Sequence, residues 1–334
     1  MDALVAHILD AAGCAPSAHN TQPWALSWQG DAVEVRIRPE RTLPAGDPAG
    51  VDTLHALGAM LENILLTLAH LGYEAGYEVA DPGRIDAPVL VVRWRPADQP
   101  PPDPVLYRMI PIRQTSRLAY AAESIPAETL DAIRAMVGAP CVLYTLTKAD
   151  AITALRSLVT AATVEQLANA RVSKELYGWM RFSPRDRRWY RDGLTADCMG
   201  WKPWEAAAAR LLLAPHVLRW LARWGLHRVL LANVDQLAPP APVLCLLMVE
   251  GDGVAVRVQA GRCLQRIWLA AAAHGLCTHP LSAAMDVDAT RRGALELFGA
   301  SSTQRHVSLF RLGRSAPPAR SPRLPADELL DVPP

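Results

Sequence analysis

Two stretches of the chain share one pattern of apolar positions. Residues 58–72 and 261–275 each begin and end on glycine, with Leu, Ile, Leu and Ala at matching places between. Apolar residues at these spacings predict a helix with a broad buried face, and the closing glycines fit helix C-caps. Because the two stretches are far apart and alike, the pattern predicts an internal duplication.

Strand-like patterns flank the predicted helices. Residues 33–37 alternate between apolar and polar, and 88–94 and 242–249 are apolar runs typical of buried strands. Residues 96–104 are rich in proline and predict a stiff connector. We therefore expect two repeats, residues 1–104 and 105–334. Within the second repeat, residues 175–232 would form an insert and residues 313–334 an extended tail.

A run of polar side chains follows the first predicted helix. Residues 15–24 read APSAHNTQPW, which we call the polar loop. Asn20 and Gln22 each offer a donor and an acceptor, and so suit a flat, hydrogen-bonding ligand. The alternative is a proline-punctuated turn without a ligand.

A second run, RQTSR at residues 113–117, is basic, and we call it the arginine segment. The guanidinium forks of Arg113 and Arg117 suit a phosphate, and Thr115 adds a hydroxyl donor. The alternative is a solvated basic loop. The sequence contains neither GxGxxG nor a P-loop, so no Rossmann or Walker nucleotide site is predicted.

Together these two runs resemble the motifs of the nitroreductase-like flavoproteins. Residues 41–43 (RTL) and 47–48 (DP) extend the resemblance to the Acg-type branch, in which two repeats are fused. The resemblance implies an α+β fold, a pseudo-dimer with mixed or antiparallel sheets beside long central helices. It also implies one FMN in the groove between the halves, the second site having decayed.

The resemblance implies FMN contacts from several separate segments. They are Ser17, His19, Asn20, Gln22, Arg113, Gln114, Thr115, Arg117, Asn233, Gln236, Thr278, His279, Pro280, Leu281, Arg320 and Arg323. Flavin N5 would carry the chemistry, so no catalytic side chain and no metal are expected.

Residues 175–205 are unusually aromatic and basic. We expect a lid or substrate wall there, in which an aromatic ring could cover the ligand; the alternative is a peripheral segment that packs the halves together. The residues assigned to this wall are Trp179, Met180, Arg181, Trp189, Tyr190 and Trp201.

Residues 206–232 predict basic amphipathic helices, with Trp220 and Trp224 on one face. Such helices can lie on a membrane. We expect instead a core or oligomer face with snorkelling arginines, and no membrane contact.

Composition narrows the classes of partner. The 34 Lys and Arg residues nearly balance the 33 Asp and Glu residues, so the chain has no strong positive field that would attract nucleic acid. Six scattered cysteines without a CxxC pair predict reduced thiols, and the first residues lack a basic signal-peptide region. No apolar run is long enough for a membrane span. We expect a cytoplasmic protein, monomeric as a pseudo-dimer or a homodimer, acting on a small molecule.

Three functions remain open on the sequence. The first is an FMN-dependent oxidoreductase that transfers hydride through N5 to or from a small organic substrate, with NAD(P)H as one candidate donor. The second is a flavin-storage protein without NAD(P)H turnover. The third is a specialised FMN-dependent dehydrogenase of a peptide or carrier-bound substrate. The sequence has no GxSxG or HExxH motif to support a hydrolase or zinc enzyme.

Overall fold

Two antiparallel sheets of four strands form the frame of the protein. A computed structural model describes residues 3–80, 87–99, 105–231 and 237–331. The first sheet contains β1 (Trp24–Gln29), β2 (Ala32–Ile37), β3 (Tyr73–Val79) and β4 (Leu90–Pro96), in the order β1-β2-β4-β3. The second contains β5 (Cys141–Leu146), β8 (Val243–Val249), β9 (Cys277–Pro280) and β10 (Arg305–Gly313), in the order β5-β8-β10-β9.

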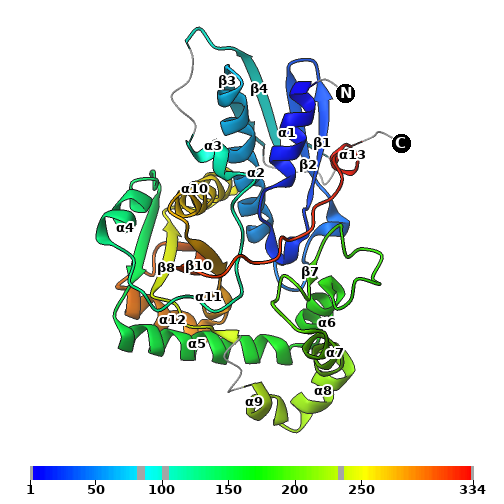
Figure 1. The fold of residues 1–334 in the computed structure, drawn as a ribbon, viewed down its shortest axis with the longest axis vertical. Coiled ribbons are helices and arrows are strands. Elements are labelled where there is room, and N and C mark those ends of the chain that lie inside the picture. The colour runs from blue at the N-terminus through cyan, green and yellow to red at the C-terminus, as the bar shows by residue number, and fades with distance from the viewer. Residues whose placement is uncertain (1–2, 81–86, 100–104, 232–236, 332–334) are drawn as a thin grey trace.

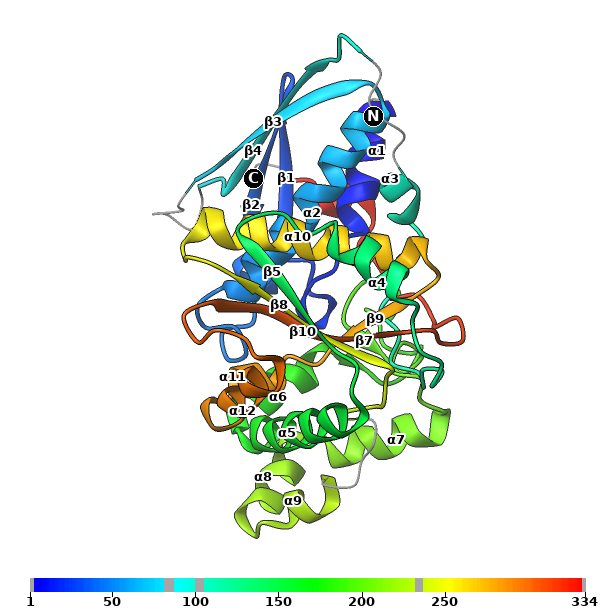
Figure 2. The ribbon, with the colours of Figure 1, turned by 90° about the vertical axis from the view of Figure 1, so that its left-hand side faces the viewer.

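The two sheets have the same topology. In each, the fourth strand along the chain lies between the second and the third. In each, a helix of 20 residues joins the second strand to the third: α2 (Val51–His70) and α10 (Val254–Ala273). These helices cross at the centre of the molecule (Figures 1 and 2). The α+β class, the antiparallel sheets and the long central helices are confirmed.

The central helices touch through their glycines. A Cβ atom on Gly58 would lie 2.0 Å from the carbonyl oxygen of Val258, and one on Gly261 would lie 2.1 Å from that of His55. Such approach between backbones is possible only where both residues lack a side chain. One turn further along, Gln265 donates to the side-chain oxygen of Asn63 at 2.7 Å across the crossing.

The chain leaves the second sheet between β5 and β8. This excursion contains α5 (Ala149–Ala168), α6 (Ala170–Trp179), the short pair β6 (Met180–Arg181) and β7 (Leu194–Thr195), and α7 (Pro203–Leu212), α8 (Pro215–Arg223) and α9 (Leu226–Leu231). A second excursion, with α11 (Ala283–Asp286) and α12 (Asp288–Phe298), lies between β9 and β10. Both α11 and α12 pack on α5. The first excursion is longer than the insert expected at 175–232, since it begins with α5.

The remaining helices cover the halves and their junction. They are α1 (Ala3–Gly13), α3 (Val105–Met109), α4 (Ala127–Arg134) and α13 (Ala326–Leu329), with single 3-10 turns at Ala18–Asn20 and Pro39–Arg41. After β10 the C-terminal tail runs extended back to the first sheet (Figure 1). There Leu330 bridges to Leu26 of β1, so the tail spans both halves.

Candidate functional site

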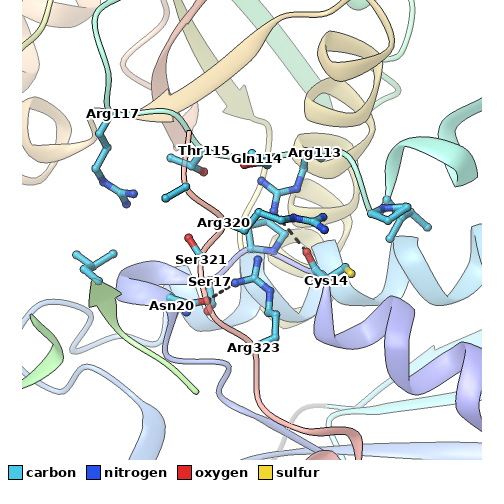
Figure 3. Close-up of a pocket in the computed structure, with 15 residues that line it drawn as sticks. Cys14, Ser17, Asn20, Arg113, Gln114, Thr115, Arg117, Arg320, Ser321 and Arg323 are labelled. Carbon is cyan, nitrogen blue, oxygen red and sulfur yellow. Dashed lines mark hydrogen bonds between the residues drawn. The ribbon is translucent and has the colours of Figure 1, made fainter. Parts of the chain in front are cut away.

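Three segments that are distant in sequence, together with Leu194 of β7, enclose one cavity of about 270 Å³. They are the loop after α1, the arginine segment with the residues before it, and the C-terminal tail. Figure 3 shows Arg113, Arg320 and Arg323 converging on the cavity, with Arg117 at its other end. The lining residues are Cys14, Pro16, Ser17, Asn20, Ile110, Pro111, Arg113, Gln114, Thr115, Arg117, Leu194, Ala319, Arg320, Ser321 and Arg323.

The polar loop follows a strained backbone path. His19, Asn20 and Gln22 have φ values of 49°, 58° and 52°, a left-handed region that non-glycine residues seldom occupy. The Ser17 hydroxyl accepts a hydrogen bond from the backbone N–H of Gln22 at 2.9 Å and so closes the turn. Backbone strain of this kind persists only where the surroundings enforce it, and it gathers at functional sites.

The side-chain amides of the polar loop bind the chain itself. Asn20 donates to the Pro322 carbonyl at 2.8 Å and accepts from Arg323 at 2.6 Å. Gln22, which is fully buried, accepts from the Leu324 N–H at 2.8 Å and donates to the Arg191 carbonyl at 3.0 Å. The sequence predicts that these amides face a ligand. In the structure they fasten the tail and residue 191 to the loop, and only Asn20 lines the cavity.

The arginine segment brings unpaired guanidinium groups into the cavity wall. Arg113 is 6% exposed, and its Nε and Nη1 atoms have no hydrogen-bond partner among the described residues. Its guanidinium group lies 5.8 Å from the ring centre of Trp268 on α10, and Nη2 donates to the Cys14 carbonyl at 3.4 Å. Arg117 Nη1 is likewise buried without a partner in the described part of the chain. These atoms are donors held ready for an acceptor.

Electrostatics shows that the cavity is short of negative charge. None of the described lining residues is acidic, whereas four are arginines. Burial, together with the positive charges of Arg323 and Arg320, lowers the pKa of Arg113 to about 9. Burial also lowers the pKa of Arg117 and of Arg323. Because buried cations need a counter-charge and hydrogen-bond acceptors, the cavity suits an anion with several oxygen atoms.

Strand β9 lies directly behind the arginine segment. Thr115 and Thr278 form a parallel bridge, and Ser116 N–H donates to the Thr278 carbonyl at 3.1 Å. His279 accepts from Arg311 at 3.1 Å, and burial holds the pKa of His279 well below its usual range, so the ring is neutral. The candidates on and next to this strand, Thr278, His279, Pro280 and Leu281, do not line the cavity; Thr278 Oγ1 is buried without a partner in the described structure.

Three predicted ligand residues, His19, Asn233 and Gln236, remain to be placed. His19 is half-buried beside Arg117 and does not line the cavity; burial, then the charge of Arg117, lowers the pKa of His19 to about 4. Asn233 and Gln236 lie outside the described residues.

The residues expected to form a lid or substrate wall pack within the first excursion. Arg181 is fully buried and pairs with Asp192 at 2.5 Å; Asp192 also pairs with Arg41 at 3.0 Å. Trp179 lies against both arginines, at 5.7 Å from Arg181 and 5.6 Å from Arg41. This network ties the excursion to Arg41 in the first half of the chain.

The other wall candidates divide between core and surface. Met180 and Trp189 are buried, Trp201 stacks on Phe182, and Tyr190 is exposed. None of the six described candidates lines the cavity; Leu194, from the same excursion, does. Sequence reasoning missed seven lining residues, because apolar or small side chains and a lone thiol carry no pattern that distinguishes a cavity wall from a core. They are Cys14, Pro16, Ile110, Pro111, Leu194, Ala319 and Ser321.

The comparisons with known proteins agree in direction with the sequence resemblance. No family model matches the chain. A proposed NAD(P)H nitroreductase of Mycobacterium tuberculosis is 25% identical over 295 residues, covering 88% of this chain and 80% of that protein. PigM of a Serratia strain, also a proposed NAD(P)H nitroreductase, is 24% identical over 300 residues, covering 86% and 82%. The chain is similar to nitroreductases.

Solved structures give partial matches of the same kind. An FMN-bound nitroreductase from Desulfitobacterium hafniense is 11% identical, covers 68% of this chain and 97% of its own, and gives a TM-score of 0.40. The FMN- and NADPH-dependent nitroreductase NfnB from a Sphingopyxis strain is 19% identical, with coverage of 68% of this chain and 98% of its own and a TM-score of 0.40.

In the described residues no helix is both long and apolar enough to cross a bilayer.

Proposed function

We propose that the chain is an FMN-binding oxidoreductase of the nitroreductase superfamily, and that its arginine-lined cavity holds the FMN phosphate. The observation that carries the proposal is the set of buried guanidinium donors without partners in the described structure, at Arg113 and Arg117. A phosphate dianion supplies both the missing acceptors and the missing charge. The similarity to proposed NAD(P)H nitroreductases over 88% of the chain supports the same assignment.

Each cavity residue has a distinct task in this proposal. Arg113 donates to the phosphate oxygens from the second half, and Arg323 adds a second positive charge from the tail, whereas Arg117, at the other end of the cavity, offers its unpartnered donor to another polar group of FMN. Asn20 positions Arg323 through their 2.6 Å hydrogen bond. Thr115 adds a hydroxyl donor at the cavity wall. Bound FMN would supply hydride transfer at N5, between NAD(P)H and a small organic acceptor.

The finer assignment is a fused pair of repeats of the Acg type, with residues 1–104 and 105–334 as the repeats. It is supported by the matching strand orders of the two sheets and by the reciprocal contact of Gly58 and Gly261 on the central helices. The cavity takes Ser17 and Asn20 from the first half and the arginine segment from the second. The proposal therefore predicts one FMN per chain; two per chain would contradict it.

The decisive experiment is the double substitution Arg113→Ala and Arg117→Ala. A hydrogen bond to a charged group contributes about 1.5–3 kcal/mol, so losing both guanidinium groups weakens FMN binding by roughly a hundredfold or more. The assay titrates FMN into apoprotein and follows the quenching of flavin fluorescence. The matched control replaces Arg93 and Arg95, exposed arginines on β4, by alanine. A double variant that keeps wild-type FMN affinity would refute the phosphate assignment.

Flavin storage is the second candidate function. It is favoured by the way Asn20 and Gln22 fasten the tail and the Arg191–Gly193 backbone over the polar loop. A fastened cover would exclude a reductant. Anaerobic addition of NADPH to the FMN-loaded protein separates the two: rapid loss of the visible flavin absorbance indicates a reductase. A flavin that only dithionite reduces indicates storage.

A further inference from the structure

Helices α7–α9 carry an unusual share of the exposed apolar surface. Among the described residues, ten large apolar side chains are well exposed; five of them lie on these three helices, and a sixth, Trp224, is the C-cap of α8. Trp204, Trp220 and Trp224 are 67%, 58% and 65% exposed. The six, which we call the tryptophan patch, are Trp204, Leu211, Leu212, Trp220, Trp224 and Leu226. A gathering of exposed apolar side chains on this scale marks a contact surface.

The tryptophan patch is interleaved with positive charge. Between residues 202 and 228 the chain has five basic residues and one acidic residue, a net charge of +4, whereas the whole chain carries +1. The basic residues are all exposed: Lys202, Arg210, Arg219, Arg223 and Arg228. The partner of this surface must therefore combine an apolar layer with negative charge.

The helices are held so that this surface stays outside. On α8, Leu218 and Leu221 are buried against the rest of the molecule, which turns Trp220 and Trp224 outward. The three helices form the end of the molecule opposite the β3–β4 hairpin (Figure 2). A protruding end of this kind suits contact with an extended, flat partner.

The charge pattern argues against a second copy of the chain as that partner. A twofold interface through the tryptophan patch would bring Arg219 and Arg223 of one copy close to the same arginines of the other. Like charges in a desolvated contact repel strongly. The exposed tryptophans do not fit the core face expected from the sequence, and the clustered arginines disfavour the oligomer face.

We propose that α7–α9 dock the protein on the surface of a bilayer that contains anionic lipid. Tryptophan side chains partition to the interface between headgroups and acyl chains, and basic side chains bind anionic headgroups. The contact is peripheral, as no described helix is suited to cross the bilayer. This inference stands apart from the proposed flavin chemistry, because none of the patch residues lines the arginine-lined cavity.

The test is vesicle flotation with the full chain. Vesicles of phosphatidylglycerol and phosphatidylcholine should carry the protein upward, vesicles of phosphatidylcholine alone should carry far less, and added salt should release it. Each basic residue near an anionic surface contributes about 1 kcal/mol, so Arg219→Gln with Arg223→Gln should lower partitioning roughly 30-fold. Trp220→Ala with Trp224→Ala should lower it through lost apolar burial.

A matched control makes the outcome specific. Arg93→Gln with Arg95→Gln removes the same charge from exposed positions on β4, at the other end of the molecule. It should leave flotation unchanged, and all three variants should keep the FMN content of the wild type. The proposal is overturned if the protein does not float with anionic vesicles, or if the control variant loses as much flotation as the patch variants. It is also overturned if the patch variants instead abolish self-association or binding to an acidic protein while flotation persists.

Discussion

The contact between the central helices predicts an unusual response to a glycine-to-alanine change. In an ordinary helix such a change stabilises by up to about 1 kcal/mol. In Gly261→Ala the new Cβ would lie 2.1 Å from the His55 carbonyl oxygen, against an ordinary contact of at least 3.4 Å. The two helices would have to separate by about 1.3 Å, the difference between these distances. Overpacking typically costs about 1–3 kcal/mol, and a rigid backbone partner favours the upper end.

The net expectation for Gly261→Ala is a loss of about 2 kcal/mol, since about 1 kcal/mol of helix propensity offsets about 3 kcal/mol of overpacking. Equilibrium unfolding in urea, followed by far-UV circular dichroism, measures it. Gly178→Ala on α6 is the matched control, because its Cβ would meet no atom within 4 Å and should stabilise slightly. If Gly261→Ala were as stable as Gly178→Ala, the backbone contact between the helices would be refuted.

Three further changes test the buried polar groups. Asp192→Asn leaves the fully buried Arg181 without its charge partner and should cost about 3–5 kcal/mol in urea unfolding. Gln22→Ala removes the acceptor of the Leu324 N–H and should speed tryptic cleavage of the C-terminal tail. Burial lowers the pKa of His55 from 6.5 to about 3, so the unfolded chain takes up a proton that the folded one refuses. Stability should therefore fall as pH drops from about 6.5, less steeply in His55→Gln.

The changes at Asp192 and Gln22 each have a surface counterpart. Asp131→Asn breaks the exposed pair with Arg134 and should cost less than about 1 kcal/mol. Asn169→Ala removes the cap of α6 and should leave the tail as resistant to trypsin as in the wild type. Equal effects in a change and its counterpart would contradict the role of burial.

Features that depend on local pattern could be predicted from the sequence. The matched glycines at 58 and 261 indicated two equivalent central helices, and α2 and α10 have equal lengths. The buried strand expected at 242–249 is β8, at Val243–Val249. The motif residues Ser17, Asn20, Arg113, Gln114, Thr115, Arg117, Arg320 and Arg323 all line one cavity. Hydrophobic periodicity and charged motifs carry this information in few residues.

Features that depend on tertiary contacts could not be predicted from the sequence. An amide side chain bonds as well to a backbone carbonyl as to a ligand, so the sequence could not show that Gln22 faces the tail. Aromatic residues serve cores, walls and surfaces alike. Trp189 is buried whereas Tyr190, its neighbour, is 76% exposed, and only the packing of the first excursion separates them.

The path of the C-terminal tail sets the order in which the cavity can form during synthesis. The tail residues of the cavity wall, from Ala319 to Arg323, are translated after all its other residues, and Leu330 must still pair with β1 of the first sheet. Domains fold as they leave the ribosome, the N-terminal parts first. The first sheet can therefore fold early, but the anion cavity closes only when the tail returns to it. Binding at this cavity would thus distinguish chains whose tail has docked on the first sheet from chains whose tail is still being made.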